Sequence, residues 1–224
     1  MKLNKFAVVC LSAGAVYGAE TSASRLNDSA DVLTAVMSAP DKGIPHELLE
    51  KAQCVVIVPG LKKGAFIFGG KYGRGYMLCR GGAGNGWSAP AGITVEGGSF
   101  GFQIGGEETD AVMLVMNKHG EAKLLESKFT LGADASVAAG PVGRSSSAET
   151  DAQMQAEILT YSRSQGVFAG VSLGGATLRP DAGSNKELYR GRRSNEQIVM
   201  GKTTPPAASL RLRSDLMKYS ARKE

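Results

Sequence analysis

Residues 54–117 read CVVIVPGLKKGAFIFGGKYGRGYMLCRGGAGNGWSAPAGITVEGGSFGFQIGGEETDAVMLVMN. Short apolar runs alternate here with glycine-rich turn signals about every eight to twelve residues, a pattern typical of an antiparallel meander. Residues 60–106 contain 16 glycines among 47 residues. At that density glycine must also lie inside strands, where it marks bulges, bends or close backbone approach. The stretch therefore predicts a glycine-rich antiparallel sheet.

Helical patterns lie on both sides of this stretch. Apolar residues recur at helical spacing over 22–38, and Pro40 ends the pattern. Further helical segments are expected at 46–52, 119–127, 185–191 and 207–220. Residues 153–163 fit either a helix or an edge strand, whereas 167–180 indicate a glycine-rich strand. We therefore expect one α+β domain over 19–224, with a mainly antiparallel, barrel- or sandwich-like sheet flanked by N- and C-terminal helices.

The first eighteen residues have the composition of a secretory signal peptide. Lys2 and Lys5 form a charged start, an apolar stretch runs from Phe6 to Val16, and small residues precede a cleavage position after Gly18. We expect residues 1–18 to be removed and the mature protein to be exported to the periplasm or outer membrane, with secretion as an alternative. No apolar run in the sequence reaches the ~18–20 residues of a membrane-spanning helix.

Two cysteines remain after removal of the leader, Cys54 and Cys79. In an oxidising compartment they can form one disulfide. Because both lie in apolar, strand-like runs, two unpaired buried thiols are the alternative. These cysteines and the two histidines, His46 and His119, are too scattered to show metal-ligand spacing. No metal and no cofactor is therefore expected.

Two serines lie in a glycine-x-serine-x-glycine pattern, Ser99 and Ser172. In α/β-hydrolases this pattern needs a helix directly after the serine, and an acid and a histidine later in the chain. Gly175 follows Ser172 closely, and no histidine comes after it. Asp110 and His119 follow Ser99 in the right order, but too few residues separate them for the intervening strands and helices. The sequence therefore predicts no catalytic residue and no enzyme.

Positive charge is concentrated in one part of the chain. The net charge of the whole chain is only +5, but six basic residues and no acid lie between Glu50 and Glu96. If the strands pair as hairpins, five of these residues fall at successive strand ends and turns and would gather on one edge: Lys62, Lys63, Lys71, Arg74 and Arg80. A cationic edge beside glycine N–H groups can bind lipid headgroup phosphates. The alternative is that these residues are solvated and protect the sheet edge from pairing.

The C-terminal section is also basic, with nine lysines and arginines against three acids from Arg190 onward. Its helix has Leu212 and Leu216 on one face and basic residues elsewhere. This arrangement fits docking on the sheet or lying on an anionic membrane surface. Nucleic acid is not an expected partner, because the chain has one tryptophan and no interleaving of aromatic and basic residues.

Several long, compositionally unusual blocks of the chain strongly resemble the SYLF domain. They occur in the order and with roughly the separations typical of that domain, and the resemblance extends from about Ser22 to the final helix. The blocks are GLKKGAFIFGGKYGRGYMLCR (60–80), GWSAPAGITVEGGSFGFQIGGEETDAVMLVMN (86–117), TLGADASVAAGPVGR (130–144), YSRSQGVFAGVSLGG (161–175) and NKELY (185–189).

The resemblance implies a lipid-binding module without catalytic residues or cofactors. Eukaryotic SYLF proteins bind phosphoinositides, partly through an N-terminal amphipathic helix, and yeast members with a Src-homology-3 domain are tied to actin. Bacterial members are typically exported. By position the membrane-contacting helix is 22–38, in which Arg25 is the one basic residue. The residues expected to insert into the membrane are Leu26, Leu33, Val36 and Met37.

The sequence thus leads to one functional expectation with one alternative. We expect non-catalytic binding of anionic phospholipid or phosphoinositide-type headgroups at the bacterial cell envelope, with the five basic residues above as headgroup contacts. The alternative is a structural or protein-interaction module of the envelope, of the actin-binding type by family, that does not bind lipid directly.

Overall fold

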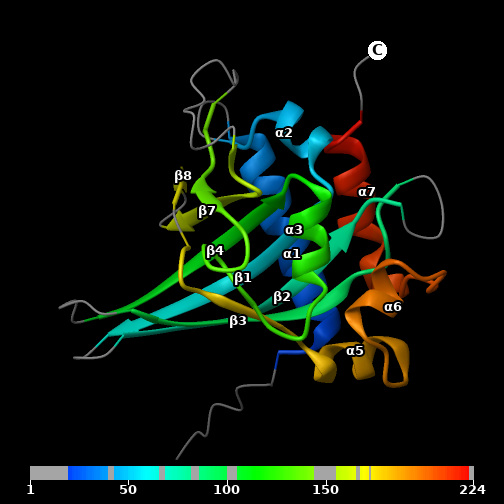
Figure 1. Ribbon diagram of the computed structural model, residues 1–224. Helices are drawn as coiled ribbons and strands as arrows, with labels where there is room; N and C mark the ends of the chain where they lie inside the picture. The colour runs from blue at the N-terminus through cyan, green and yellow to red at the C-terminus, as the bar shows by residue number, and fades with distance from the viewer. Residues whose placement is uncertain are drawn as a thin grey trace, which may run out of the picture.

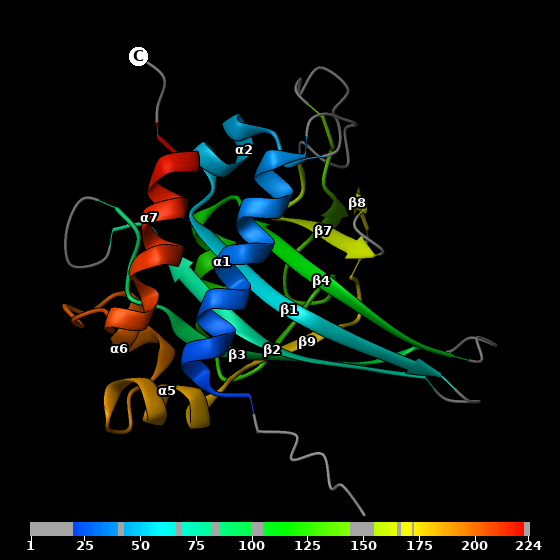
Figure 2. The same cartoon turned by 180° about the vertical axis from the view of Figure 1, so that it is seen from behind.

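The fold is seen in a computed structural model, shown in Figures 1 and 2. The structure describes residues 20–39, 43–65, 69–81, 86–99, 105–143, 155–164, 167–171 and 173–221. The expected leader at 1–18 and Ser172 lie outside these residues.

Four long strands form the centre of the sheet: β1 (Cys54–Ala65), β2 (Gly69–Cys79), β3 (Ala91–Ser99) and β4 (Gly105–Val115). They pair antiparallel in the spatial order β3-β2-β1-β4. The β1–β2 register runs from Cys54 opposite Cys79 to Ala65 opposite Gly69. These strands are longer than the apolar runs in the sequence, because they continue through lysines, glutamates and glycines to a far end that projects from the helices (Figure 2).

Shorter strands complete the sheet at both sides: β5 (Phe129–Thr130), β6 (Val137–Ala139), β7 (Ile158–Ser164), β8 (Val167–Gly170) and β9 (Thr177–Pro180). β9 and then β5 follow β3, whereas β7 and then β6 follow β4, and β8 also pairs with β7. Among the described strands only β6 and β7 pair in parallel. The expected mainly antiparallel α+β domain is confirmed, and its sheet is curled into a half-barrel.

A bulge in β1 explains two of the glycines inside strands. The register of β1 against β4 shifts between Val58 and Leu61, and Gly60 at the shift has a φ of +57°, which favours glycine. Across from the bulge, β2 passes so close to β1 that a Cβ atom on Gly75 would collide with the carbonyl oxygen of Ile57. These glycines let the strands bend without losing their pairing.

The helices α1 (Ser22–Ser38), α2 (His46–Lys51) and α7 (Leu210–Tyr219) cover one face of the sheet (Figure 2). α1 begins where the side chain of Thr21 accepts a hydrogen bond from the Ser24 amide at 3.0 Å. One apolar cluster joins these helices to the sheet; it includes Leu26, Leu33, Leu49, Val55, Ile57, Tyr76, Trp87, Val112, Tyr161, Leu212 and Leu216. The C-terminal helix therefore docks on the protein through Leu212 and Leu216, both fully buried.

A second apolar cluster lies on the opposite face of the sheet, against α3 (Lys118–Leu124) and α6 (Asn195–Val199). Its members include Cys54, Val56, Met77, Cys79, Ile93, Met113, Leu124, Phe129, Leu178 and Ile198. An apolar cluster thus covers each face of the central strands. Because alternate residues of a strand point to opposite faces, both sets of residues are apolar there, and the apolar runs in the sequence are continuous.

The structure also shows which elements the remaining segments form, from residue 158 to the C-terminal helix. Residues from Ile158 onward form strand β7 rather than a helix. The expected turn at 185–191 is the helix α5 (Ala182–Tyr189), which is capped by Asp181. The helix α6 was not expected; Ser194 and Gln197 cap it reciprocally. The expected final helix begins as a short 3-10 turn, η2 (Ala207–Ser209), followed by α7. Within the described residues, each helix is too short or too polar to cross a membrane.

Candidate functional site

Three of the five predicted headgroup contacts lie close together at the far end of β1 and β2. Lys63 is directly opposite Lys71, and Lys62 is directly opposite Tyr72. Strand alternation places Lys63 and Lys71 on one face of the sheet and Lys62 and Tyr72 on the other. Lys62 is exposed, and the Tyr72 ring is 52% exposed. We call Lys62, Lys63 and Lys71 the strand-end lysines.

Lys71 lies where its positive charge is disfavoured, although Lys63 and Lys62 have the acidic neighbours Glu107 and Glu108 on β4. Burial lowers the pKa of Lys71, and the neighbouring positive charge of Lys63 lowers it further. The nearest acid on the same face is Glu107 of β4, whose carboxylate lies 3.6 Å from the Lys63 ammonium group. This single long contact joins half-exposed groups, so it contributes little energy. Glu107 therefore neutralises the Lys63–Lys71 pair only weakly.

Arg74 does not join the strand-end lysines, because it takes part in an ion pair elsewhere. Its guanidinium group donates to Asp181 at 2.7 Å and to the Ser184 hydroxyl at 3.2 Å. Burial raises the pKa of Asp181, but hydrogen bonds from Arg74 and Ser184 outweigh it and hold that pKa below its usual value. Arg74 thus connects β2 to the start of α5.

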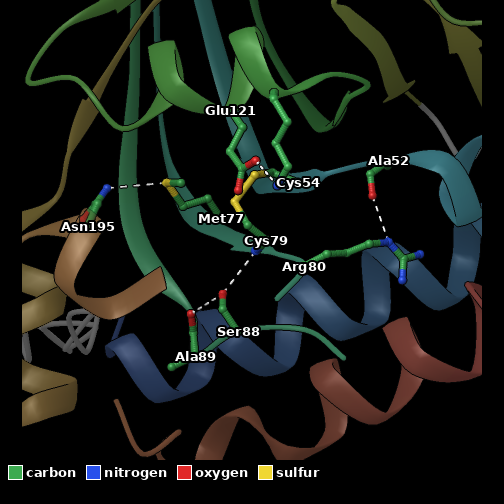
Figure 3. The surroundings of a disulfide bond; sticks show 10 residues. Ala52, Cys54, Met77, Cys79, Arg80, Ser88, Ala89, Glu121 and Asn195 are labelled. Carbon is green, nitrogen blue, oxygen red and sulfur yellow. Dashed lines mark hydrogen bonds and ion pairs between the residues drawn. A yellow bond between two sulfur atoms is a disulfide. The ribbon is translucent and has the colours of Figure 1, made fainter. Parts of the chain in front are cut away.

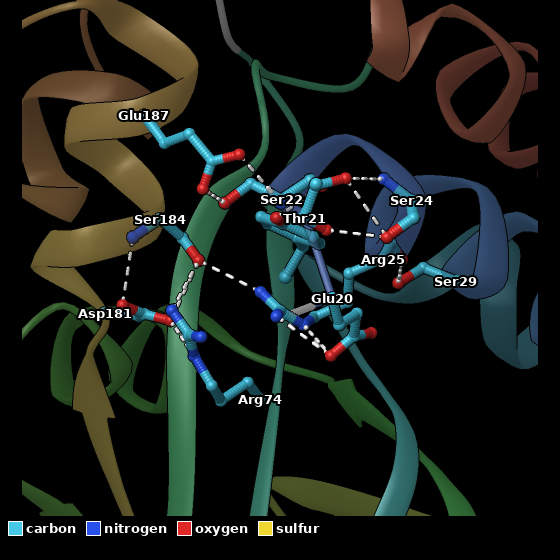
Figure 4. A network of polar contacts seen from close by, with 11 residues as sticks. Glu20, Thr21, Ser22, Ser24, Arg25, Ser29, Arg74, Asp181, Ser184 and Glu187 are labelled. Atoms are coloured by element: carbon cyan, nitrogen blue, oxygen red, sulfur yellow. Dashed lines mark hydrogen bonds and ion pairs between the residues drawn. The ribbon is translucent and has the colours of Figure 1, made fainter. Parts of the chain in front are cut away.

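The same cluster fastens the first turn of α1 to the rest of the protein (Figure 4). Arg25, only 2% exposed, donates to Ser184 at 3.1 Å and to Glu20 at 2.9 Å. Glu187 of α5 accepts from the amide and hydroxyl of Ser22, at 3.0 and 2.6 Å. We call this group the α1 anchor; its residues are Glu20, Ser22, Arg25, Arg74, Asp181, Ser184 and Glu187. Arg25, the one basic residue of the expected membrane helix, is therefore buried and makes its hydrogen bonds within the protein.

Arg80 lies at the other end of β2, nine residues from Lys71 and so about 30 Å away along the strand. It donates to the carbonyl oxygens of Ala52 at 2.9 Å and Leu49 at 3.2 Å. Its guanidinium carbon is 4.6 Å from the centre of the Trp87 ring. The expectation that all five basic residues gather on one edge is thus not met: Arg74 and Arg80 hold the structure together, and the strand-end lysines form the remaining group.

The four residues expected to insert into a membrane lie in the core. Leu26, Leu33 and Val36 are fully buried, and Met37 is 9% exposed. Their apolar face packs against the sheet and α7. Membrane insertion of these side chains would require α1 to leave the sheet and the α1 anchor to open.

An acidic pocket of about 480 Å³ lies between α1 and the bulge of β1. Its lining includes Glu20, Asp28, Asp31, Glu108 and Asp110, with Lys62 and Arg163 as the basic residues. Burial raises the pKa of Asp28, and the nearby acids Glu20 and Asp31 raise it further. Sequence reasoning missed this pocket, because its residues come from four separate segments and share no motif.

The disulfide between Cys54 and Cys79 is present and buried (Figure 3). The two cysteines are opposite each other on β1 and β2, with Cα atoms 3.9 Å apart. Of the two alternatives that the sequence left open, the structure has the bonded one. The carboxyl group of Glu121 on α3 approaches the two sulfur atoms.

The residues that could have served a serine nucleophile have other partners. Asp110 accepts from Arg163 at 2.7 Å and from the amide of Gly60 at 3.1 Å. His119 pairs with Glu157 at 2.5 Å, and His46 contacts the carbonyl oxygen of Tyr219 at 3.1 Å. Within the described residues, Asp110 and the two histidines thus have partners other than one another.

Together these features define an α+β domain with a curled sheet, an anchored N-terminal helix and a small polar surface at the strand ends. Residues 96–219 match the Ysc84 family, described as Las17-binding protein actin regulator. This match covers more than half of the chain. The chain belongs to this family, and the resemblance to the SYLF domain is confirmed.

Proteins from several eukaryotes are similar in sequence to most of this chain. An SH3 domain-containing protein of Schizosaccharomyces pombe is 37% identical over 169 residues, which are 74% of this chain and 39% of that protein. LAS seventeen-binding protein 3 of Saccharomyces cerevisiae is 35% identical over 171 residues, 75% of this chain and 37% of that protein. SH3 domain-containing YSC84-like protein 1 of Homo sapiens is 34% identical over 171 residues, 76% of this chain and 49% of that protein. The chain thus spans less than half the length of each of these relatives.

Proposed function

We propose that this protein is a non-catalytic module that binds anionic lipid headgroups through the strand-end lysines. The observation that carries the proposal is the direct opposition of Lys63 and Lys71 on neighbouring strands. Like charges at directly paired positions repel each other, and a headgroup phosphate bound between the two lysines would replace that repulsion with two attractions.

The surroundings of the lysines fit a membrane surface. Lys62 and the exposed ring of Tyr72 lie on the opposite face of the same strand end, and tyrosine is favoured at membrane–water interfaces. In the sequence, the segments that join these strand ends are rich in Phe and Ile at 66–68 and 100–104, and they lie outside the described residues.

The expected affinity is modest and strongly dependent on salt. Each lysine near an anionic surface contributes about 1 kcal/mol, and this attraction falls off within a Debye length. Glu107 and Glu108 lie opposite Lys63 and Lys62 on β4, so part of the attraction is offset. Insertion of α1 is a second, later step in this proposal, since it requires the α1 anchor to open.

Export to the cell envelope is part of the same proposal. A buried disulfide is the usual state of a cysteine pair in an oxidising compartment, and Cys54 and Cys79 form one. This supports export, which the leader-like residues 1–18 predict from the sequence alone.

A protein-interaction module is the second candidate. The family description, Las17-binding protein actin regulator, favours it. In this case the strand-end lysines would be solvated charges, and the binding surface would lie elsewhere. Co-sedimentation of the protein with actin filaments tests this candidate.

Flotation of the protein with vesicles tests lipid binding. We expect flotation with vesicles that contain phosphatidylserine or a phosphoinositide, but not with phosphatidylcholine alone, and we expect salt to abolish it. Inorganic phosphate or a soluble inositol phosphate as competitor separates recognition of the phosphate from recognition of the membrane. Absence of flotation at low salt, or equal flotation with neutral vesicles, would contradict the proposal.

A further inference from the structure

The buried carboxyl group of Glu121 lies beside the disulfide between Cys54 and Cys79. The two sulfur atoms and a carboxyl oxygen of Glu121 all lie within 4.8 Å of one another. Both cysteines are fully buried, and Glu121 is only 3% exposed. In Figure 3 the Glu121 side chain descends from α3 toward the bond between Cys54 and Cys79.

Among the residues that the structure describes, one oxygen of this carboxyl group has no hydrogen-bond partner. Oε2 of Glu121 accepts from the Lys118 ammonium group at 2.6 Å, whereas Oε1 is buried and unpartnered. A disulfide offers no proton to donate, so the neighbouring sulfur atoms cannot satisfy it. Buried polar atoms almost always have a partner, and an exception calls for an explanation such as an ion.

The three groups have the chemistry of a site for a thiophilic cation once the disulfide is reduced. Two cysteine thiolates and one carboxylate are common ligands of Zn²⁺. Two sulfurs on one tetrahedral Zn²⁺ are about 3.8 Å apart, given Zn–S bonds of ~2.3 Å. Strands whose paired Cα atoms are 3.9 Å apart can hold two thiolates at that separation, and Glu121 is already within reach of both.

We propose that reduced Cys54 and Cys79, together with Glu121, bind a thiophilic divalent cation such as Zn²⁺. The disulfide is then the closed, metal-free state of the same site. A dithiol reductant opens it: the reductant loses two electrons and two protons and becomes a disulfide, while the S–S bond breaks and each cysteine sulfur gains one proton. Binding of the cation then releases these two protons and forms two metal–sulfur bonds.

Access to the site depends on α3. This helix has only seven residues and carries Glu121 over the cysteine pair. It is held by the Asn117 cap, by Leu124 in the apolar cluster and by the exposed contact between His119 and Glu157. Short elements with few buried contacts open locally at small cost, so a reductant and a cation can reach the sulfurs without unfolding of the sheet.

The test is metal binding by the full-length mature chain in oxidised and reduced form. A phosphine reductant is suitable, because it converts the disulfide to two thiols by consuming one water and adds no competing thiol. Co²⁺ is the spectroscopic probe, since thiolate coordination gives a charge-transfer absorption, and Zn²⁺ affinity is measured by competition with a chromophoric chelator. Circular dichroism before and after metal addition reports whether the reduced chain is folded.

Three variants separate the proposed site from non-specific binding. Glu121→Gln removes the carboxylate ligand but keeps the shape of the side chain, and a double Cys54→Ser, Cys79→Ser variant removes both sulfurs. The matched control is Glu126→Gln, because Glu126 follows the same helix, is about half exposed and pairs with Lys123 at 2.9 Å.

We expect one cation per reduced chain, none on the oxidised chain, and a thiolate absorption band with Co²⁺. Glu121→Gln should weaken Zn²⁺ binding by about tenfold or more, whereas Glu126→Gln should leave it unchanged. The proposal is overturned if the reduced chain shows no thiolate band, or if Glu121→Gln binds as tightly as Glu126→Gln. It is also overturned if the reduced chain is unfolded and Zn²⁺ does not refold it. Lipid binding does not enter these outcomes.

Discussion

Lys63 on β1 lies directly opposite Lys71 on β2, so two ammonium groups share one face of the sheet. Burial and the charge of Lys63 together lower the pKa of Lys71. Like charges in directly paired positions destabilise a sheet. A bound anion would remove this cost, and the pair therefore links the stability of the protein to its proposed ligand.

Replacement of Lys71 by threonine should make the free protein more stable. We expect a gain of about 0.3–0.5 kcal/mol in the free energy of unfolding at low salt, because the repulsion disappears and threonine favours strands. Urea unfolding at neutral pH measures this gain. High salt should reduce it by screening, and a loss of stability instead would show that the two lysines do not repel each other.

The same variant has a predicted pH dependence. The pKa of Lys71 in the folded protein is lower than its usual value of 10.5, so the folded state releases the proton first as the pH rises. The repulsion is fully present at neutral pH and is relieved between the lowered pKa and 10.5. The stability advantage of Lys71→Thr should therefore shrink as the pH approaches 10.5.

Asp181 should contribute to stability in two separable ways. It pairs with Arg74 and also caps α5 by accepting from the Ser184 amide at 3.0 Å. Asp181→Ala should cost about 2–3 kcal/mol, and Asp181→Ser should recover about 1 kcal/mol of this because serine also caps. Asp31→Asn, at an exposed ion pair, should cost less than about 0.5 kcal/mol.

This contribution of Asp181 should disappear in acid. The pKa of Asp181 is lower in the folded protein than its usual value of 3.8, so its stabilising effect is present above 3.8 and is lost as the pH falls through the lowered value. Urea unfolding of the protein and of Asp181→Ala should therefore converge below pH 3.8. A constant difference down to the most acidic conditions would show that the ion pair is not the source.

The burial of α1 predicts a large effect of one apolar substitution. Leu33 is fully buried between the sheet and α7. Leu33→Ala should therefore lower the free energy of unfolding by about 2–5 kcal/mol. Asn27→Ala, at an exposed position of the same helix, is the control and should have little effect. A small loss for Leu33→Ala would indicate that α1 lies free of the sheet in solution.

Arg80 should matter for stability and not for lipid binding. Arg80→Met leaves the carbonyl oxygens of Leu49 and Ala52 without these donors and removes the contact with Trp87. We expect a loss of about 1–3 kcal/mol in unfolding free energy. The affinity of the folded variant for anionic vesicles should stay within about twofold of the original protein. A clear loss of vesicle affinity without a loss of stability would contradict this prediction and indicate that Arg80 contacts lipid headgroups.

The sequence predicts the sheet and the main helices well, because their signals are local. The apolar runs between glycines mark the four central strands, and the spacing of Leu26, Leu33 and Val36 marks α1 and its buried face. The same spacing suits a core helix and a membrane-inserting helix, so periodicity alone could not tell which surface this face would cover. The family match does not show either whether this apolar face covers the sheet or a membrane.

The candidate site depends on pairings that are distant in the sequence. The acid-free stretch between Glu50 and Glu96 contains the strand-end lysines, but it does not show that Asp181 binds Arg74 or that two carbonyl oxygens bind Arg80. The neighbours of the strand-end lysines on β4, Glu107 and Glu108, were outside that stretch. Likewise Glu121 lies 42 residues after Cys79, so no ligand spacing pointed to the group around the disulfide.

The most direct test of the lipid-binding account is a vesicle titration of two variants with equal charge change. Lys62, Lys63 and Lys71 are changed to glutamate in one; in the other, three exposed lysines away from the strand ends are changed, Lys128, Lys186 and Lys202. The account predicts at least about a tenfold loss of affinity for phosphatidylserine vesicles in the first variant and a much smaller, salt-sensitive loss in the second. Equal losses in both variants, or undiminished binding by the first, would contradict it.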